Sequence, residues 1–268
     1  MTFTLLISSQ KGGVGKTTVA TNIAAVLRYY GNPTLLIDTD IANPSVTPFL
    51  GISSFNYGLK ELLDNDSIEL KDAIISYQQG RFDILPAAAN PEHYYVFNDE
   101  KLSKLYNKIK KLDYKFIIID TAPASFIEAL SKYYDEALIV TTPDPASVLG
   151  ASRLSKVYQK HHMNHRLIIN RVEESKFEMK REDIEKVYGD VAYAIIPEDP
   201  SVKEAINKMI PAYIYNRGSP FSIAIENIAR AYLLKAGSSE SLVFEGKAPE
   251  KRKQSFIDKL KEAFGKKQ

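Results

Sequence analysis

Four short runs of almost continuously apolar residues constrain the fold of this chain more than any other feature. Each run is five to seven residues long, and polar or helix-patterned sequence separates it from the next. Strands of a parallel sheet are buried on both faces, and they therefore carry such runs instead of alternating apolar and polar residues. The runs are residues 3–8 (FTLLIS), 34–38 (TLLID), 115–120 (KFIIID) and 136–142 (EALIVTT).

Helical patterns lie between these runs. Residues 166–170 and 191–196 continue the series of strands, and Ser219 opens a long final helix. An alternation of strands and helices predicts a doubly wound α/β fold, with a mainly parallel sheet, helices on both faces and a ligand at the carboxyl ends of the strands. The two clearest helical patterns are Val19, Ile23, Leu27 and Tyr30, and Leu102, Leu105, Ile109 and Leu112.

Length and composition are those of a soluble globular protein. The chain has 268 residues, of which 44% are hydrophobic and 25% are charged, and we expect one domain over residues 1–235. No apolar run reaches the length of a membrane span, and the first residues do not resemble a signal peptide, so we expect a cytoplasmic protein. Cysteine is absent, which excludes disulfides and iron–sulfur clusters held by thiolates.

A glycine-rich loop, SSQKGGVGKTTVA at residues 8–20, follows the first expected strand and enters the first expected helix. In this context backbone N–H groups can point toward an anion at a helix N-terminus, and phosphate is the natural guest. The strict P-loop pattern fails at Gln10, and the variant K-G-G-x-G-K-T-T fits. Lys16 would reach the β- and γ-phosphates, and the Thr17 hydroxyl would hold Mg²⁺. The expected nucleotide-binding residues of the loop are Gly12, Gly13, Val14, Gly15, Lys16, Thr17 and Thr18.

The sequence KGGVGKTT resembles the deviant Walker A loop of the MinD/ParA ATPases, and the resemblance covers roughly residues 3–235. It implies ATP as the nucleotide and a homodimer that forms with ATP. It also implies that Lys11 is the signature lysine, which reaches across the dimer interface to the phosphates of the partner's ATP. A second cation supplied by another subunit would neutralise charge on the γ-phosphate, as an arginine finger does.

Three aspartates at strand ends complete the expected catalytic and metal site. By the same resemblance, Asp40 positions the attacking water, Asp38 supports Mg²⁺ or the geometry of the switch segment, and Asp120 binds Mg²⁺ through water. The family usually has proline two residues after this last aspartate, whereas this chain has Ala122 followed by Pro123. The conformation of the segment after Asp120 therefore stays open.

The adenine base has an expected site after two late strands. The resemblance places Asn170 as the base-recognising residue, with Pro197 and Asp199 lining the base. An amide can both donate to and accept from adenine, which suits Asn170 to this role. Without the resemblance, Asn170 would read as a turn residue that ends a strand.

The C-terminal segment differs from the rest of the chain in charge. Residues 247–268 carry eight Lys/Arg against three Asp/Glu, so the first 246 residues have a net charge of −3. We expect a linker over residues 236–253 and an amphipathic basic tail over residues 254–268. Its apolar stripe is typical of a helix that lies on a membrane, and it resembles the membrane-targeting helix of MinD proteins. Packing on the domain or on a partner protein remains the alternative.

The expected function is a MinD-like switch that dimerises with ATP and hydrolyses it slowly under the control of an activating protein. It would be cytoplasmic, associate peripherally with the membrane when ATP is bound, and position division or other cellular machinery. The alternative is a ParA-type DNA-segregation ATPase, whose ATP dimer binds DNA nonspecifically. That function requires a basic core, whereas the first 246 residues are net acidic.

Overall fold

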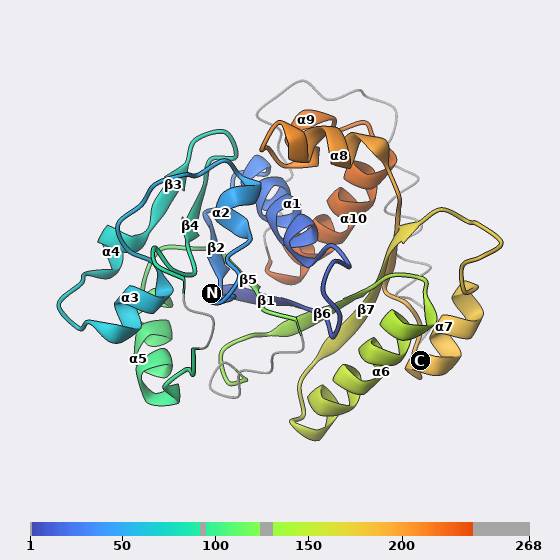
Figure 1. Cartoon of the computed structure of the whole chain (residues 1–268), viewed down its shortest axis with the longest axis horizontal. Coiled ribbons are helices and arrows are strands. Elements are labelled where there is room, and N and C mark those ends of the chain that lie inside the picture. The colour runs from blue at the N-terminus through green and yellow to red at the C-terminus, as the bar shows by residue number, and fades with distance from the viewer. Residues whose placement is uncertain (1, 92–94, 124–130, 238–268) are drawn as a thin grey trace.

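The computed structural model describes residues 2–91, 95–123 and 131–237, which form one eight-stranded sheet with helices on both faces (Figure 1). The strand order is β3-β4-β2-β5-β1-β6-β7-β8. All neighbouring strands pair in parallel except β3 and β4. The doubly wound α/β fold expected from the sequence is confirmed.

Most strand boundaries lie within one residue of those expected, although the last strand begins three residues late. The strands are β1 (Phe3–Ser8), β2 (Thr34–Asp38), β3 (Ile75–Tyr77), β4 (Phe82–Leu85), β5 (Phe116–Asp120), β6 (Glu136–Thr141), β7 (His165–Val172) and β8 (Ala194–Pro197). The helices are α1 (Lys16–Tyr29), α2 (Val46–Phe49), α3 (Leu59–Asp64), α4 (Leu70–Ala73), α5 (Asp99–Ile109), α6 (Pro145–Lys160), α7 (Arg181–Tyr188), α8 (Pro200–Asn207), α9 (Ala212–Tyr215) and α10 (Pro220–Lys235).

Two hydrophobic cores lie on opposite faces of the sheet, because successive strand residues point to opposite sides. Leu5 and Ile118 belong to the core that packs under α1 and α10, whereas Leu6 and Ile119 belong to the core that packs against α3, α5, α6 and α7. Figure 1 shows the same division of the helices between the two faces. Burial on both faces explains why the strand runs are continuously apolar.

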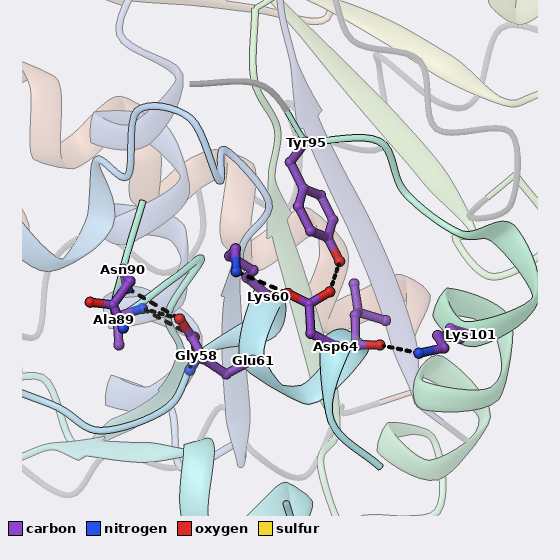
Figure 2. A network of polar contacts seen from close by, with 9 residues as sticks. Gly58, Lys60, Glu61, Asp64, Ala89, Asn90, Tyr95 and Lys101 are labelled. Carbon is purple, nitrogen blue, oxygen red and sulfur yellow. Dashed lines mark hydrogen bonds and ion pairs between the residues drawn. The ribbon is translucent and has the colours of Figure 1, made fainter. Parts of the chain in front are cut away.

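The edge hairpin β3–β4 and the short helix α3 were not predicted from the sequence. A polar network fixes this region, as Figure 2 shows. The Glu61 carboxylate accepts hydrogen bonds from the backbone N–H groups of Gly58, Ala89 and Asn90, at 2.8 to 3.1 Å. One side chain of α3 thereby ties the helix start to the loop that follows β4.

The described chain ends shortly after α10, at Gly237. The expected tail over residues 254–268 and nearly all of the expected linker lie outside the described residues. None of the helices in the described ranges is long and apolar enough to cross a membrane.

Candidate nucleotide-binding site

The glycine loop leads directly from β1 into α1, and two of its glycines adopt left-handed backbone conformations. Gly13 has φ +79°, and Gly15, the residue before the first turn of α1, has φ +96°. Residues with a Cβ rarely adopt such angles. The expected loop geometry therefore depends on glycine at these two positions, and it places the start of α1 at the carboxyl edge of the sheet.

Asn170 lies inside β7 (His165–Val172), two residues before its end, and packs against this loop. Its Nδ2 donates to the carbonyl of Val14 at 2.7 Å, and the residue is 2% exposed. A Cβ built on Gly15 would lie only 2.4 Å from the same Nδ2. In this structure Asn170 therefore braces the loop, and recognition of a base by its amide stays a prediction.

A hydroxyl and carboxylate cluster lies beneath the loop. Thr17 Oγ1 donates to Asp120 Oδ2 at 2.6 Å and lies 2.8 Å from Ser45 Oγ. Thr17 comes from the first turn of α1, Ser45 precedes α2, and Asp120 ends β5. The structure thus brings together Thr17 and Asp120, two of the three residues expected at the metal.

Asp38 is the third residue expected at the metal. It lies beside Asp120, because β2 and β5 are paired strands. Both of its oxygens accept backbone hydrogen bonds: Oδ1 from Asp40, and Oδ2 from Ser45 and Val46, at 2.9 to 3.0 Å. These bonds fix the segment between β2 and α2. Of its two expected roles, this geometry favours support of the switch segment.

The electrostatics of the cluster favour a cation. Burial, and next the charge of Asp38, raise the pKa of Asp120, while Lys16 and the Thr17 hydroxyl lower it. Burial likewise raises the pKa of Asp38, although the backbone hydrogen bonds that this carboxylate accepts lower it in part. Asp120 Oδ1 is buried and has no hydrogen-bond partner in the described part of the chain. An unpaired carboxylate oxygen beside a hydroxyl suits Mg²⁺, which prefers oxygen ligands.

Asp40 lies beyond β2 and is half-buried. Burial raises its pKa, whereas a hydrogen bond from the Asn43 backbone and the charge of Lys16 lower it. The bond from Asn43 N to Asp40 Oδ1 is 3.0 Å long. Asp40 is thus electrostatically coupled to Lys16, and its role in positioning water stays a prediction.

The two loop lysines occupy opposite environments. Lys16 is 8% exposed beneath the loop, whereas the Lys11 side chain is 52% exposed. Lys11 Nζ lies 3.3 Å from Oδ1 of Asp144, which caps the N-terminus of α6. Lys11 therefore points away from the cluster formed by Thr17 and Asp120.

The other expected base residues lie at the start of α8. Asp199 caps this helix, and its carboxylate also accepts a bond from the backbone of Phe221 in α10, at 3.0 Å. Burial would raise the pKa of Asp199, but the backbone bonds from Phe221 and Ser201 outweigh it and lower the pKa. Pro197 ends β8 and is partly exposed. Contact of either residue with a base stays a prediction.

Sequence reasoning missed two residues that the structure places at the site. Ser45 contacts Thr17, and Asp144 pairs with Lys11. Asp144 followed by Pro145 carries a helix-start signal that could have marked it as a cap. Nothing in the sequence alone indicates that either residue contacts the loop, since both contacts are long-range. The segment after Pro123 lies outside the described residues.

The parallel sheet, the glycine loop at the start of α1 and the carboxylate cluster beneath it define a P-loop nucleotide-binding protein. A sequence profile described as the CobQ/CobB/MinD/ParA nucleotide binding domain matches residues 5–212. The chain belongs to this family, within which its fold is that of the MinD ATPases.

Individual relatives agree with this assignment. An uncharacterised ATP-binding protein of Methanocaldococcus jannaschii is 29% identical over 97% of each chain. The structure of the septum site-determining protein MinD of Pyrococcus horikoshii, complexed with Mg-ADP, is 30% identical, with a TM-score of 0.79 over 89% of this chain and 98% of that one. The MinC:MinD cell division complex of Aquifex aeolicus contains a chain that is 26% identical, with a TM-score of 0.75 over 93% and 98%.

Proposed function

We propose that this protein is an ATPase that dimerises when it binds ATP with Mg²⁺, hydrolyses the ATP slowly, and binds a membrane surface reversibly. The observation that carries the proposal is the opposite placement of Lys16 and Lys11. One lysine is buried where it can serve the nucleotide of its own chain, and the other is exposed where it can serve a partner's. The Mg-ADP in the similar MinD structure supports the choice of ligand.

Each residue of the cluster has a place in this function. Lys16 and the loop N–H groups would hold the phosphates, and Thr17 with Asp120 would hold Mg²⁺, Asp120 through water. Mg²⁺, when bound, neutralises charge that develops on the phosphates. Asp40 would orient the water, while Asp38 keeps the intervening segment in place through its three backbone bonds.

Dimerisation would require Lys11 to exchange one anionic partner for another. In the single chain Lys11 is paired with Asp144, and both side chains are largely exposed. An exposed ion pair contributes at most about 1 kcal/mol, so a desolvated phosphate of a partner's ATP can displace it. Hydrolysis would then depend on pairing, because the second cation arrives only with the second chain.

The membrane part of the proposal rests on the tail, residues 254–268. A single amphipathic tail gives only marginal, reversible binding. Two tails held on one dimer bind with avidity, because the second acts at an effective concentration on the order of millimolar once the first has inserted. The protein would thus be cytoplasmic until ATP pairs it. An activating protein and a cargo, in the manner of the MinC:MinD complex, would complete the switch.

Sedimentation with anionic vesicles tests this proposal. The intact chain should bind with ATP and Mg²⁺ but not with ADP, and binding should weaken with salt. Phe256→Ser with Phe264→Ser should abolish it while the ATP dimer persists in light scattering. A matched control is Phe177→Ser with Val96→Ser, two residues of the described body that are 86% and 68% exposed. Equal binding with ADP, or unchanged binding of the tail variant, would contradict the proposal.

A further inference from the structure

The two edges of the sheet differ in function and in charge. The candidate nucleotide site lies at the carboxyl edge, where the parallel strands end. At the opposite edge the helices end and the strands begin, and we call it the amino edge. It comprises the helix ends and the segments leading into strands, at residues 28–33, 80–83, 108–115, 131–136, 160–166, 189–193 and 235–237.

The amino edge is basic, although the first 246 residues together are net acidic. Its seven segments contain ten Lys/Arg and five Asp/Glu, a net charge of +5, whereas the other residues that the structure describes carry −4. The C-terminal ends of the helices contribute about half a negative charge each, which reduces this positive field without reversing it. Positive charge is therefore concentrated at the amino edge relative to the other described residues.

Two of the five acidic groups of this edge, Glu136 and Asp83, are paired within the protein, whereas Asp113, Asp135 and Asp190 are exposed. Glu136 is buried and pairs with Arg166 at 2.6 Å and with Lys235 at 2.9 Å. The Asp83 carboxylate accepts from Ser76 and Tyr114, at 2.7 Å each.

Five lysines of the edge are exposed and form no ion pair with a residue that the structure describes. They are Lys108 in the last turn of α5, and Lys110, Lys111, Lys132 and Lys160 beyond it in the chain.

The chain leaves the described body at this same edge. Lys235 is the last residue of α10, and its pairing with Glu136 fixes the helix end to the start of β6. Lys115 Nζ donates to the carbonyl of Ala236 at 2.9 Å. The last described residues therefore contact Lys115 and Glu136, two residues of the amino edge.

We propose that the amino edge is a second membrane contact, which binds anionic lipid headgroups through Lys110, Lys111, Lys132 and Lys160 alongside the tail. This inference rests on the proposed membrane function. An inserted tail would hold the edge near the surface, where each lysine adds attraction to anionic lipid that decays within a Debye length. It would also turn the nucleotide site away from the membrane, since that site lies at the other edge. Helix stabilisation alone does not account for the cluster, because Lys111 and Lys132 lie outside the helices.

The test uses the full chain with ATP and Mg²⁺ on phosphatidylglycerol and on phosphatidylcholine vesicles. The edge variant combines Lys110→Gln, Lys111→Gln, Lys132→Gln and Lys160→Gln. The control variant makes the same change at four exposed lysines outside the edge segments: Lys176, Lys180, Lys203 and Lys208. Each lysine near the surface contributes about fivefold to the affinity for anionic lipid. We therefore expect the edge variant to lose at least tenfold in affinity for the anionic vesicles. The control variant should lose much less.

The outcomes separate the inference from the proposed function. Equal loss in the edge and control variants would overturn the inference and leave the tail-based function standing. No ATP-dependent vesicle binding by the unaltered chain would contradict both. If the edge variant lost affinity for duplex DNA while binding vesicles normally, the edge would be a nucleic-acid-binding surface and the inference would be wrong. Light scattering with ATP checks that each variant still dimerises.

Discussion

At the scale of single residues, Gly15 is the position where the loop tolerates least change. Its φ of +96° would strain any other residue, and an added Cβ would meet Asn170 at 2.4 Å. Gly13 shares the left-handed conformation, with φ +79°, but an added Cβ there would have no atom within 4 Å. A substitution at Gly13 therefore tests backbone strain alone, whereas a substitution at Gly15 adds a steric conflict with Asn170.

We expect Gly13→Ala to lower the free energy of unfolding by about 1–2 kcal/mol, the cost of left-handed backbone for a residue with a Cβ. Gly15→Ala should cost about 2–5 kcal/mol, because overpacking against Asn170 adds about 1–3 kcal/mol to the strain. Urea denaturation without nucleotide measures both. Equal losses in the two variants would show that Asn170 does not brace the loop.

The sequence predicted site residues best where they belong to one short, contiguous motif. Lys16 and Thr17 stand in one short pattern; in the structure Lys16 is buried and Thr17 donates to Asp120, while their contact with a nucleotide stays a prediction. Asp144 and Ser45 could not be predicted as site residues. They contact Lys11 and Thr17 across 133 and 28 positions of sequence, and only the fold creates those contacts.

At the scale of elements, α3 depends on one carboxylate. Glu61→Ala would leave the backbone N–H groups of Gly58, Ala89 and Asn90 without their acceptor. We expect a loss of about 2–3 kcal/mol in the free energy of unfolding by urea, and a smaller loss for Glu61→Gln, which keeps one acceptor. Glu69→Ala, at an exposed carboxylate paired with Lys71, should change little. Equal stability of the Glu61 and Glu69 variants would contradict the role given to this network.

Glu136 connects β6, β7 and α10 and predicts a dependence of stability on pH. Burial would raise the pKa of Glu136, but hydrogen bonds from Lys235 and Arg166 outweigh it and lower the pKa. The stabilisation is therefore present above the unfolded pKa of about 4.3, and it is lost as the pH falls through the lower folded value.

At neutral pH, Glu136→Gln should lower the free energy of unfolding by about 1.5–3 kcal/mol. The difference from the parent should shrink as the pH falls below the ordinary range of a carboxyl group. Urea unfolding across the pH range measures it, with the exposed Glu100→Gln as control. A difference that stays constant on acidification would contradict the ion pairs as its cause.

Elements differed in how well the sequence predicted them. The central strands are buried on both faces, so their apolar runs alone fixed their positions nearly to the residue. The edge strand β3 is only three residues long and partly exposed, which leaves no such run. The helices α2 and α9 have four residues each and follow from tertiary contacts rather than from periodicity.

At the scale of the whole molecule, charge is the property that the sequence conceals. A net charge of +2 hides an acidic body and a basic tail, which the order of residues reveals. It also hides a basic amino edge, which appears only when seven separate segments come together in the fold. An acidic body argued against DNA as a partner, whereas the fold shows that a basic surface and an acidic total coexist.

We propose that ATP pairs two chains through Lys11, while Lys16 serves the chain's own nucleotide. Light scattering with ATP and Mg²⁺, together with ATP affinity, tests it most directly. We predict that the parent has twice the chain mass of 30.1 kDa, that Lys11→Ala binds ATP but stays monomeric, and that Lys16→Ala does not bind ATP. A Lys11→Ala dimer, or equal losses of ATP affinity in the two variants, would contradict the account.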